Sequence, residues 1–236
     1  MSDDPRRAVV ASNLDAIQRT IAAACSRSGR DPSTVRLVAA AKTVDPREVA
    51  WVVESGVPDI GHNYVRELRA GRSAVPGATW HFIGTLQSGS ANQVADLADV
   101  VETLVPGNAM RRLARRAAGS GRRLPALVEV DLAGRGTGVA PGLVPEAADE
   151  VAATEGLELA GLMTLPPLPA DPEESRPYFR RLRELLSEVA LRHPAATELS
   201  MGMSLDYGVA VEEGATMVRI GTALFGARPP ADQGRT

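Results

Sequence analysis

A single lysine, Lys42, stands out among the residues able to do chemistry. The chain has 236 residues, of which 26 are lysine or arginine, and subtracting the one lysine leaves 25 arginines. A primary amine can attack a carbonyl group and form an imine, which a guanidinium cannot do. The composition therefore predicts a chemical task for Lys42, although a surface lysine kept by chance would give the same count.

Glycine and hydroxyl residues gather in two segments near the other end of the chain, 199–204 and 218–226. Glycines let backbone N–H groups approach an anion closely, and hydroxyl groups donate further hydrogen bonds. The two segments therefore predict a phosphate site, with ordinary helix capping by the serines as the alternative. The candidate donors are Ser200, Ser204, Gly221 and Thr222.

Arg219 alternates with two apolar neighbours, Val218 and Ile220. This pattern is typical of a strand, so Arg219 is expected to point to the opposite face from them, into the interior beside a ligand. An unpaired guanidinium would be costly there. A phosphate group or a ring nitrogen is the expected partner.

Short apolar runs that alternate with helical segments must position these residues. Several runs are apolar on consecutive positions, which is typical of strands covered on both faces. Eight repeats predict an α/β fold, a single (β/α)8 TIM-type barrel with an extra N-terminal helix over Arg6–Ser28, as one domain over residues 1–236. The expected strands are Arg36–Ala41, Asp59–Gly61, Thr79–Phe82, Asp99–Thr103, Pro125–Val130, Leu157–Met163, Thr197–Ser200 and Met217–Ile220.

In such a barrel, ligands bind at the carboxyl ends of the strands. Lys42 follows the first expected strand, and the glycine and hydroxyl residues follow the seventh and eighth. A doubly wound sheet is the alternative fold, and it would place the same residues at the same edge. A long helix is expected over Glu173–His193.

Composition narrows the class of protein. The formal net charge of -3 gives no reason to expect a nucleic acid partner, and no apolar stretch is long enough to predict a membrane span. The lone Cys25 fits a reducing compartment, so a cytoplasmic protein is expected. No group of side chains has metal-ligand spacing, so no metal site is predicted.

Six separated motifs resemble one known family. They are the segments 38–43 (VAAAKT), 61–67 (GHNYVRE), 80–88 (WHFIGTLQS), 161–164 (GLMT), 199–206 (LSMGMSLD) and 218–226 (VRIGTALFG). In this order, and across nearly the whole chain, they are similar to the YggS/PROSC family of pyridoxal phosphate homeostasis proteins.

The resemblance implies a fold-type III barrel, like the N-terminal domain of alanine racemase, that holds pyridoxal 5'-phosphate (PLP) on Lys42 as a Schiff base. In related racemases the residue matching Arg219 faces the pyridine nitrogen, which would keep that nitrogen unprotonated and the ring a weak electron sink. The cofactor-binding residues that the resemblance implies are Lys42, Asn63, His81, Met163, Ser200, Ser204, Arg219, Gly221 and Thr222.

Three segments depart from the family pattern. His62 stands where the family usually has Glu, Gly89-Ser90 stand where it usually has Asn-Lys, and the loop 134–138 (GRGTG) lacks a lysine that the family often carries. Because these changes leave Lys42 and the phosphate loops intact, we expect them to affect regulation or cofactor transfer more than PLP binding. The spacing and position of the same loop do not suit a dinucleotide fingerprint.

The family implies intracellular PLP homeostasis, meaning buffering or delivery of the cofactor in support of amino-acid and keto-acid balance. PLP-dependent apo-enzymes are possible recipients, and a monomer or weak dimer is expected. No catalytic residue is assigned, because the chain leaves no room for the second domain that supplies a base in alanine racemase. A small PLP-dependent amino-acid racemase and a PLP-independent Schiff-base aldolase are the alternatives.

Overall fold

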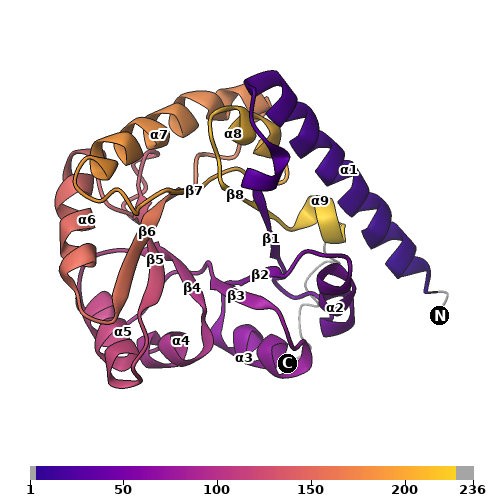
Figure 1. Ribbon diagram of the computed structural model, residues 1–236. Coiled ribbons are helices and arrows are strands. Elements are labelled where there is room, and N and C mark those ends of the chain that lie inside the picture. Colours follow the sequence, from indigo (N-terminus) through magenta and orange to yellow (C-terminus); the bar gives the residue numbers. More distant parts are fainter. Residues whose placement is uncertain (1–3, 227–236) are drawn as a thin grey trace, which may run out of the picture.

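A closed barrel of eight parallel strands forms the centre of the molecule in the computed structural model, which describes residues 4–226 (Figure 1). Each strand pairs with the next in chain order, and pairing of β8 with β1 closes the sheet. The strands are β1 (Arg36–Ala40), β2 (Asp59–His62), β3 (Thr79–Phe82), β4 (Val100–Leu104), β5 (Leu124–Val130), β6 (Leu157–Thr164), β7 (Glu198–Ser200) and β8 (Met217–Ile220). The predicted barrel is confirmed, and the doubly wound alternative is wrong because the sheet has no edge.

The predicted strand limits agree with the observed ones to within one residue at every end. Those of β3 and β8 are identical to the prediction. The agreement has a simple cause, because the apolar runs end where the backbone leaves the sheet and enters polar turns.

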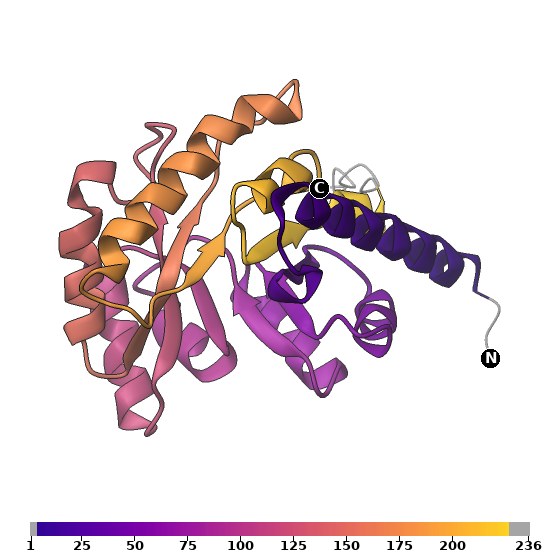
Figure 2. The same cartoon turned by 45° about the horizontal axis from the view of Figure 1, so that its top comes forward.

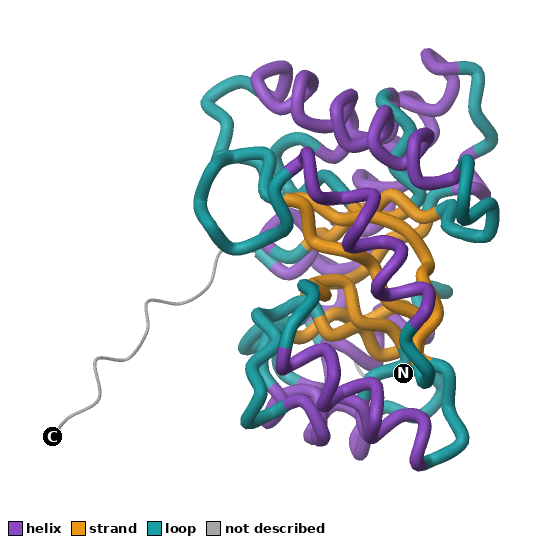
Figure 3. Tube along the Cα trace, turned by 90° about the vertical axis from the view of Figure 1, so that its left-hand side faces the viewer, coloured by secondary structure: helices purple, strands orange, loops and turns teal. Residues whose placement is uncertain are grey.

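Helices surround the barrel, and the side view of Figure 3 shows them outside the strands. The extra N-terminal helix, α1, crosses one side of the barrel beside α8 and α9 (Figure 2). Asp4 caps its start and Gly29, in the left-handed conformation, ends it. The helices are α1 (Pro5–Ser28), α2 (Pro46–Glu54), α3 (Val65–Ala74), α4 (Ala91–Leu97), α5 (Asn108–Gly119), α6 (Val144–Ala153), α7 (Arg176–Ala190), α8 (Tyr207–Glu212) and α9 (Thr222–Phe225).

The helix expected over Glu173–His193 is shorter at both ends. A 3-10 turn, η3 (Pro172–Ser175), precedes α7, which begins only at Arg176. Pro177 explains this start, since proline lacks an N–H group and favours the first turn of a helix. At the other end, α7 stops at Ala190, before Pro194 disfavours helical backbone in the residue that precedes it.

Two separate apolar clusters follow from the alternation of side chains along the strands. Outward residues such as Leu37 and Ala39 join the large cluster between strands and helices. Inside the barrel, the apolar cluster contains four buried residues, Val38, Leu127, Met163 and Met217. The rest of the interior is strongly polar, and this polar part carries the candidate site.

Candidate functional site at the carboxyl ends of the strands

Lys42 lies just beyond β1, at the end of the barrel where all eight strands finish. Its side chain is half-buried, and its Nζ lies 5.2 Å from the centre of the Tyr64 ring. The next residue, Thr43, has a φ of 60° and is the one non-glycine residue with positive φ among residues 4–226. A β-branched residue in this conformation is strained, and such strain is common at functional sites. The backbone therefore turns sharply where the only lysine is presented.

Asn63 follows β2, the neighbour of β1, and so belongs to the same end of the barrel. It is half-buried, and its side-chain amide makes a long contact of 3.5 Å with the carbonyl oxygen of Ile83. Gly84 makes this packing possible, because a Cβ there would lie 2.0 Å from the carbonyl oxygen of Asn63.

The loops after β7 and β8 meet at the mouth on the other side of β1. The Ser204 hydroxyl accepts a hydrogen bond from the N–H of Ala223 at 3.1 Å, which ties the two loops together. Gly221 lies so close to β1 that a Cβ there would be 3.0 Å from the carbonyl oxygen of Ala40. The loops that carry Ser204, Gly221 and Thr222 therefore lie beside the end of β1. Gly221 contacts Ala40, which precedes Lys42 by two positions in the chain.

Asp206 holds the first of these loops in shape. One of its carboxylate oxygens accepts the N–H of Met203 at 2.7 Å, and the other accepts the buried Ser175 hydroxyl at 2.7 Å. Gly202 has a φ of +89°, and a Cβ there would lie 2.5 Å from the Cβ of Ala210. A carboxylate clamp and a glycine therefore fix the loop that carries Ser204.

Ser200 and Arg219 lie deeper than the loops that follow them. Arg219 points into the barrel and is 4% exposed. It donates one hydrogen bond to the Ser200 hydroxyl and another, of 2.9 Å, to the carbonyl oxygen of Thr164. Ser200 in turn donates to Glu102 at 2.5 Å. The Ser200 hydroxyl thus donates one hydrogen bond and accepts another within the barrel, whereas the Ser204 hydroxyl only accepts one among the described residues.

His81 is fully buried on the same interior face, between two carboxylates. Its Nδ1 lies 2.7 Å from Glu102 and its Nε2 lies 2.9 Å from Asp59. Burial alone would lower the pKa of His81, but the hydrogen bonds and charges of Asp59 and Glu102 outweigh it and raise the pKa to about 9. Since each nitrogen faces an acceptor, the ring carries both protons at neutral pH.

Asp59 and Glu102 are functional candidates that were not predicted from the sequence. Burial would raise the pKa of Glu102, but its hydrogen bond to His81 and the charges of His81 and Arg219 lower it, so it is a carboxylate. The available signal was an acidic residue within each of two short apolar runs, at positions that alternate with outward-facing neighbours. Such a residue must point into the barrel and needs a partner there.

Two other residues singled out in the sequence lie outside this polar network. Met163 is fully buried in the interior apolar cluster, beside Val38 and Leu127. His62 faces the outside of the barrel, where its ring stacks on Trp80 at a centroid distance of 5.6 Å. Burial lowers the pKa of His62 to about 4, and neither of its nitrogens has a hydrogen-bond partner among the described residues.

The described residues give two further findings on ligands and membranes. Within residues 4–226, no three His, Cys, Asp or Glu side chains come together as a metal ion would require. None of the helices in this range is both long and apolar enough to cross a membrane.

Comparisons with known proteins agree with this geometry. The family model of the alanine racemase N-terminal domain matches residues 12–229. The pyridoxal phosphate homeostasis protein of Aquifex aeolicus is 37% identical over 220 residues, covering 91% of this chain and 96% of that protein. The corresponding protein of Pseudomonas aeruginosa is 35% identical over 223 residues, covering 93% and 96%.

Solved structures show the same barrel. PipY of Synechococcus elongatus with PLP bound has a TM-score of 0.80 and 30% identity, covering 92% of this chain and all of that one. An alanine racemase of Clostridium difficile has a TM-score of 0.70 and 14% identity, covering 95% of this chain and 61% of that one. The second likeness concerns the fold alone.

Proposed function

The chain belongs to the family of pyridoxal phosphate homeostasis proteins, and from this premise we propose that it binds PLP at the carboxyl ends of its strands and serves to buffer or deliver the cofactor. The observation that carries the proposal is the placement of the only lysine. Lys42 stands at the mouth of the barrel, just beyond β1, which pairs with the β8 strand that precedes Gly221 and Thr222. A carbonyl-reactive amine and a phosphate-type loop on neighbouring strands suit an aldehyde that carries a phosphate.

The residues at the mouth fit this ligand in chemical type. Lys42 would hold the aldehyde covalently, while Ser204, Gly221 and Thr222 would hold the phosphate by hydroxyl and backbone N–H donors. Arg219 approaches from below and would face the ring nitrogen. When bound, the cofactor supplies an electron sink, which a guanidinium beside the ring nitrogen keeps weak because it cannot give up its proton.

The remaining predicted residues would have lesser parts in the site. Asn63 would border the ring from β2, and Met163 would pack below it. Ser200 and His81 were predicted to contact the cofactor, but their hydrogen bonds are made to other residues within the barrel. We place them beneath the cofactor, where they support Arg219.

We also propose that this protein is a carrier with little turnover, that it acts in the cytoplasm, and that PLP-dependent apo-enzymes receive the cofactor. Cys25 is buried and is the only cysteine, which suits a reducing compartment. Racemisation needs a base on each face of the bound amino acid, and the Lys42 amine can serve only one of them.

Borohydride trapping tests the proposal. Reduction of the protein with bound PLP should attach one pyridoxyl group, found on Lys42 by peptide mass spectrometry. Lys42→Arg should abolish the visible colour while the protein stays folded by circular dichroism. A yellow protein with unmodified Lys42 would contradict the anchor, and rapid formation of D-alanine from L-alanine would contradict the carrier role.

A further inference from the structure

We infer that Asp59, His81 and Glu102 are positioning residues for the cofactor, forming with Ser200 a hydrogen-bonded relay through the barrel that fixes the Arg219 guanidinium toward the mouth. The inference rests on the proposed function, because it takes the mouth as the PLP site. It adds residues that lie on three strands, β2, β3 and β4, away from the loops that border the ligand.

The relay is continuous from one end of the barrel to the other. Asp59 is the first residue of β2, and Arg219 is the third of the four residues of β8. Between them, His81 joins Asp59 to Glu102 at 2.9 and 2.7 Å, and Ser200 joins Glu102 to Arg219. Each link has the geometry of a hydrogen bond with a charged partner, which is the strong kind.

Glu102 is the residue that crosses the interior. It comes from β4, whereas its partners Ser200 and Arg219 come from β7 and β8, on the far side of the closed sheet in Figure 1. Its Oε2 also lies 3.8 Å from Nη1 of Arg219. Removing a carboxylate that is fully buried among such partners would leave their positive charges uncompensated inside the barrel.

The charges of the relay balance. Two carboxylates, Asp59 and Glu102, face two cations, His81 and Arg219. Glu129 is also buried, and burial raises the pKa of its carboxyl group. Its negative charge, when present, favours the charged form of Arg219. Replacing Glu102 by a neutral residue would leave an excess positive charge, which the relay could relieve only by deprotonating His81 or by moving Arg219.

Fixing the guanidinium matters because its plane sets the direction of every N–H group. A guanidinium has five donors in a rigid plane. Nη1 is held by Ser200 and Nη2 by the carbonyl oxygen of Thr164, so the plane cannot rotate freely. The donors that remain then meet a ring nitrogen only in one orientation, and the relay sets that orientation.

A ligand that lacks the ring nitrogen provides the sharpest test. PLP and its 1-deaza analogue, in which a C–H replaces that nitrogen, would be titrated into the full-length protein and into Glu102→Gln. The variant should bind PLP about 10-fold to 100-fold more weakly, as loss of a charge-assisted hydrogen bond predicts, and should bind the deaza analogue with an affinity within about threefold of the wild type. Glu213→Gln, a buried carboxylate outside the barrel, is the matched control and should change neither affinity.

The apoprotein gives a second readout. In 15N spectra of the wild type at pH 7, both nitrogens of the His81 ring should be protonated, and Glu102→Gln should remove this signature. Should Glu102→Gln fail to fold, His81→Gln takes its place, with the same selective loss of PLP affinity expected.

Each result has one meaning. Equal losses for PLP and the deaza analogue, or no loss for either, would overturn the relay's role. Borohydride labelling of Lys42 in the wild type distinguishes a failure of the relay from a failure of the proposed function. If the wild-type protein carried no PLP on Lys42, the proposed function itself would be wrong.

Discussion

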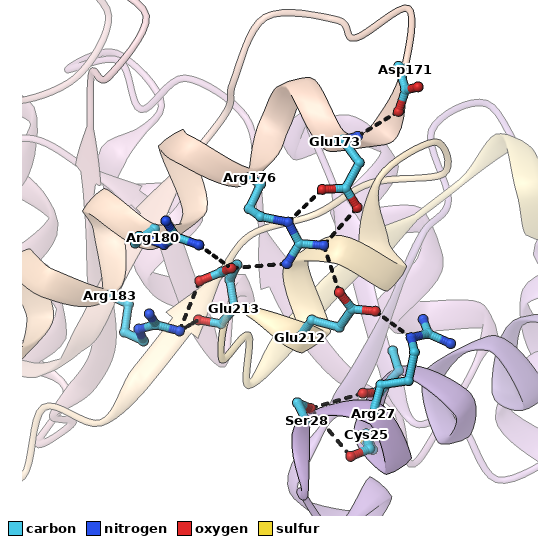
Figure 4. A network of polar contacts seen from close by, with 11 residues as sticks. Cys25, Arg27, Ser28, Asp171, Glu173, Arg176, Arg180, Arg183, Glu212 and Glu213 are labelled. Atoms are coloured by element: carbon cyan, nitrogen blue, oxygen red, sulfur yellow. Dashed lines mark hydrogen bonds and ion pairs between the residues drawn. The ribbon is translucent and has the colours of Figure 1, made fainter.

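Carboxylates and cations gather in two regions of this molecule, one inside the barrel and one outside it. Inside, Glu102 is fully buried between His81 and the Ser200–Arg219 pair. Outside, Glu213 lies between α7 and α8 and contacts Arg176 and Arg180 at 3.0 and 3.2 Å (Figure 4). Both carboxylates are shielded from water, but their partners are not equally shielded.

The outer cluster is built from long side chains that remain partly in water. Arg176, Arg180 and Arg183 surround Glu213, and their side chains are 24%, 55% and 44% exposed. Arg176 also reaches Glu212, which Arg27 contacts from α1 at 2.6 Å. This cluster links three helices, whereas the inner relay links strands to a guanidinium at the proposed ligand site. The difference teaches that similar ion pairs can serve packing in one place and orientation in another.

The largest expected effect comes from removing the central carboxylate of each region. Glu102→Ala removes the carboxylate that lies close to both buried cations, His81 and Arg219, and so leaves an uncompensated charge inside the barrel, which should lower the free energy of unfolding by about 3 to 5 kcal/mol. Glu213→Ala leaves arginines that water can solvate, so its cost should be about 1 kcal/mol. Urea unfolding of both apoproteins measures the difference, and equal costs would mean that burial of the partners does not separate the two regions.

The contrast also explains what the sequence could predict. Apolar runs place the strands, and the position of Lys42 after the first run is enough to put it at the mouth. Glu102 is different, because its Ser200 partner is 98 residues away and becomes a neighbour only when the barrel closes. The charge of His81 could not be predicted either, since it depends on two carboxylates from β2 and β4.

Local sequence likewise gives no sign of some outer features. His62 looks like a simple replacement in the family motif, yet it stacks on Trp80 and its nitrogens have no hydrogen-bond partner among the described residues. Its Nδ1 lies 3.7 Å from a carboxylate oxygen of Glu67. Asp206 stands in a quoted motif, but its role as a clamp depends on Ser175, from a turn 31 residues earlier. The sequence pattern within a segment predicts its helices and strands. The role of a polar residue depends on contacts with other segments, which that pattern does not show.

Alkaline pH should weaken the inner region selectively. The pKa of His81 is raised from 6.5 to about 9, so the folded state binds a proton that the unfolded state has lost between these values. The stability from His81 is complete below pH 6.5 and disappears as pH rises through 9, a loss of up to about 3 kcal/mol. Urea unfolding at pH 6.5 and 9 should show this fall in the wild type and not in His81→Gln.

His62 provides the opposite slope as an internal control. Burial lowers its pKa to about 4, so here the unfolded state binds the extra proton between pH 4 and 6.5. Its contribution should be complete above pH 6.5 and should decline as the solution is acidified. His62→Phe keeps an aromatic ring against Trp80 and should remove this decline, while leaving the alkaline slope of His81 intact. An alkaline slope that changed with His62→Phe would assign the titration to the wrong ring.

Salt should produce the smallest effect and the cleanest separation of the two regions. Raising the ionic strength from 0.1 to 1 M shortens the screening length from about 10 Å to about 3 Å, which weakens charges that water can reach. The outer arginines are accessible in this way, so the cost of Glu213→Ala should shrink by about 0.5 kcal/mol at 1 M sodium chloride.

His81 and Glu102 are both 0% exposed, so the cost of Glu102→Ala should be the same at both salt concentrations once the general effect of salt on the wild type is subtracted. Urea unfolding of the three proteins at each concentration gives these differences directly. A salt-sensitive cost at Glu102 would mean that water enters the barrel interior, and the distinction between a dry relay and a solvated cluster would then fail.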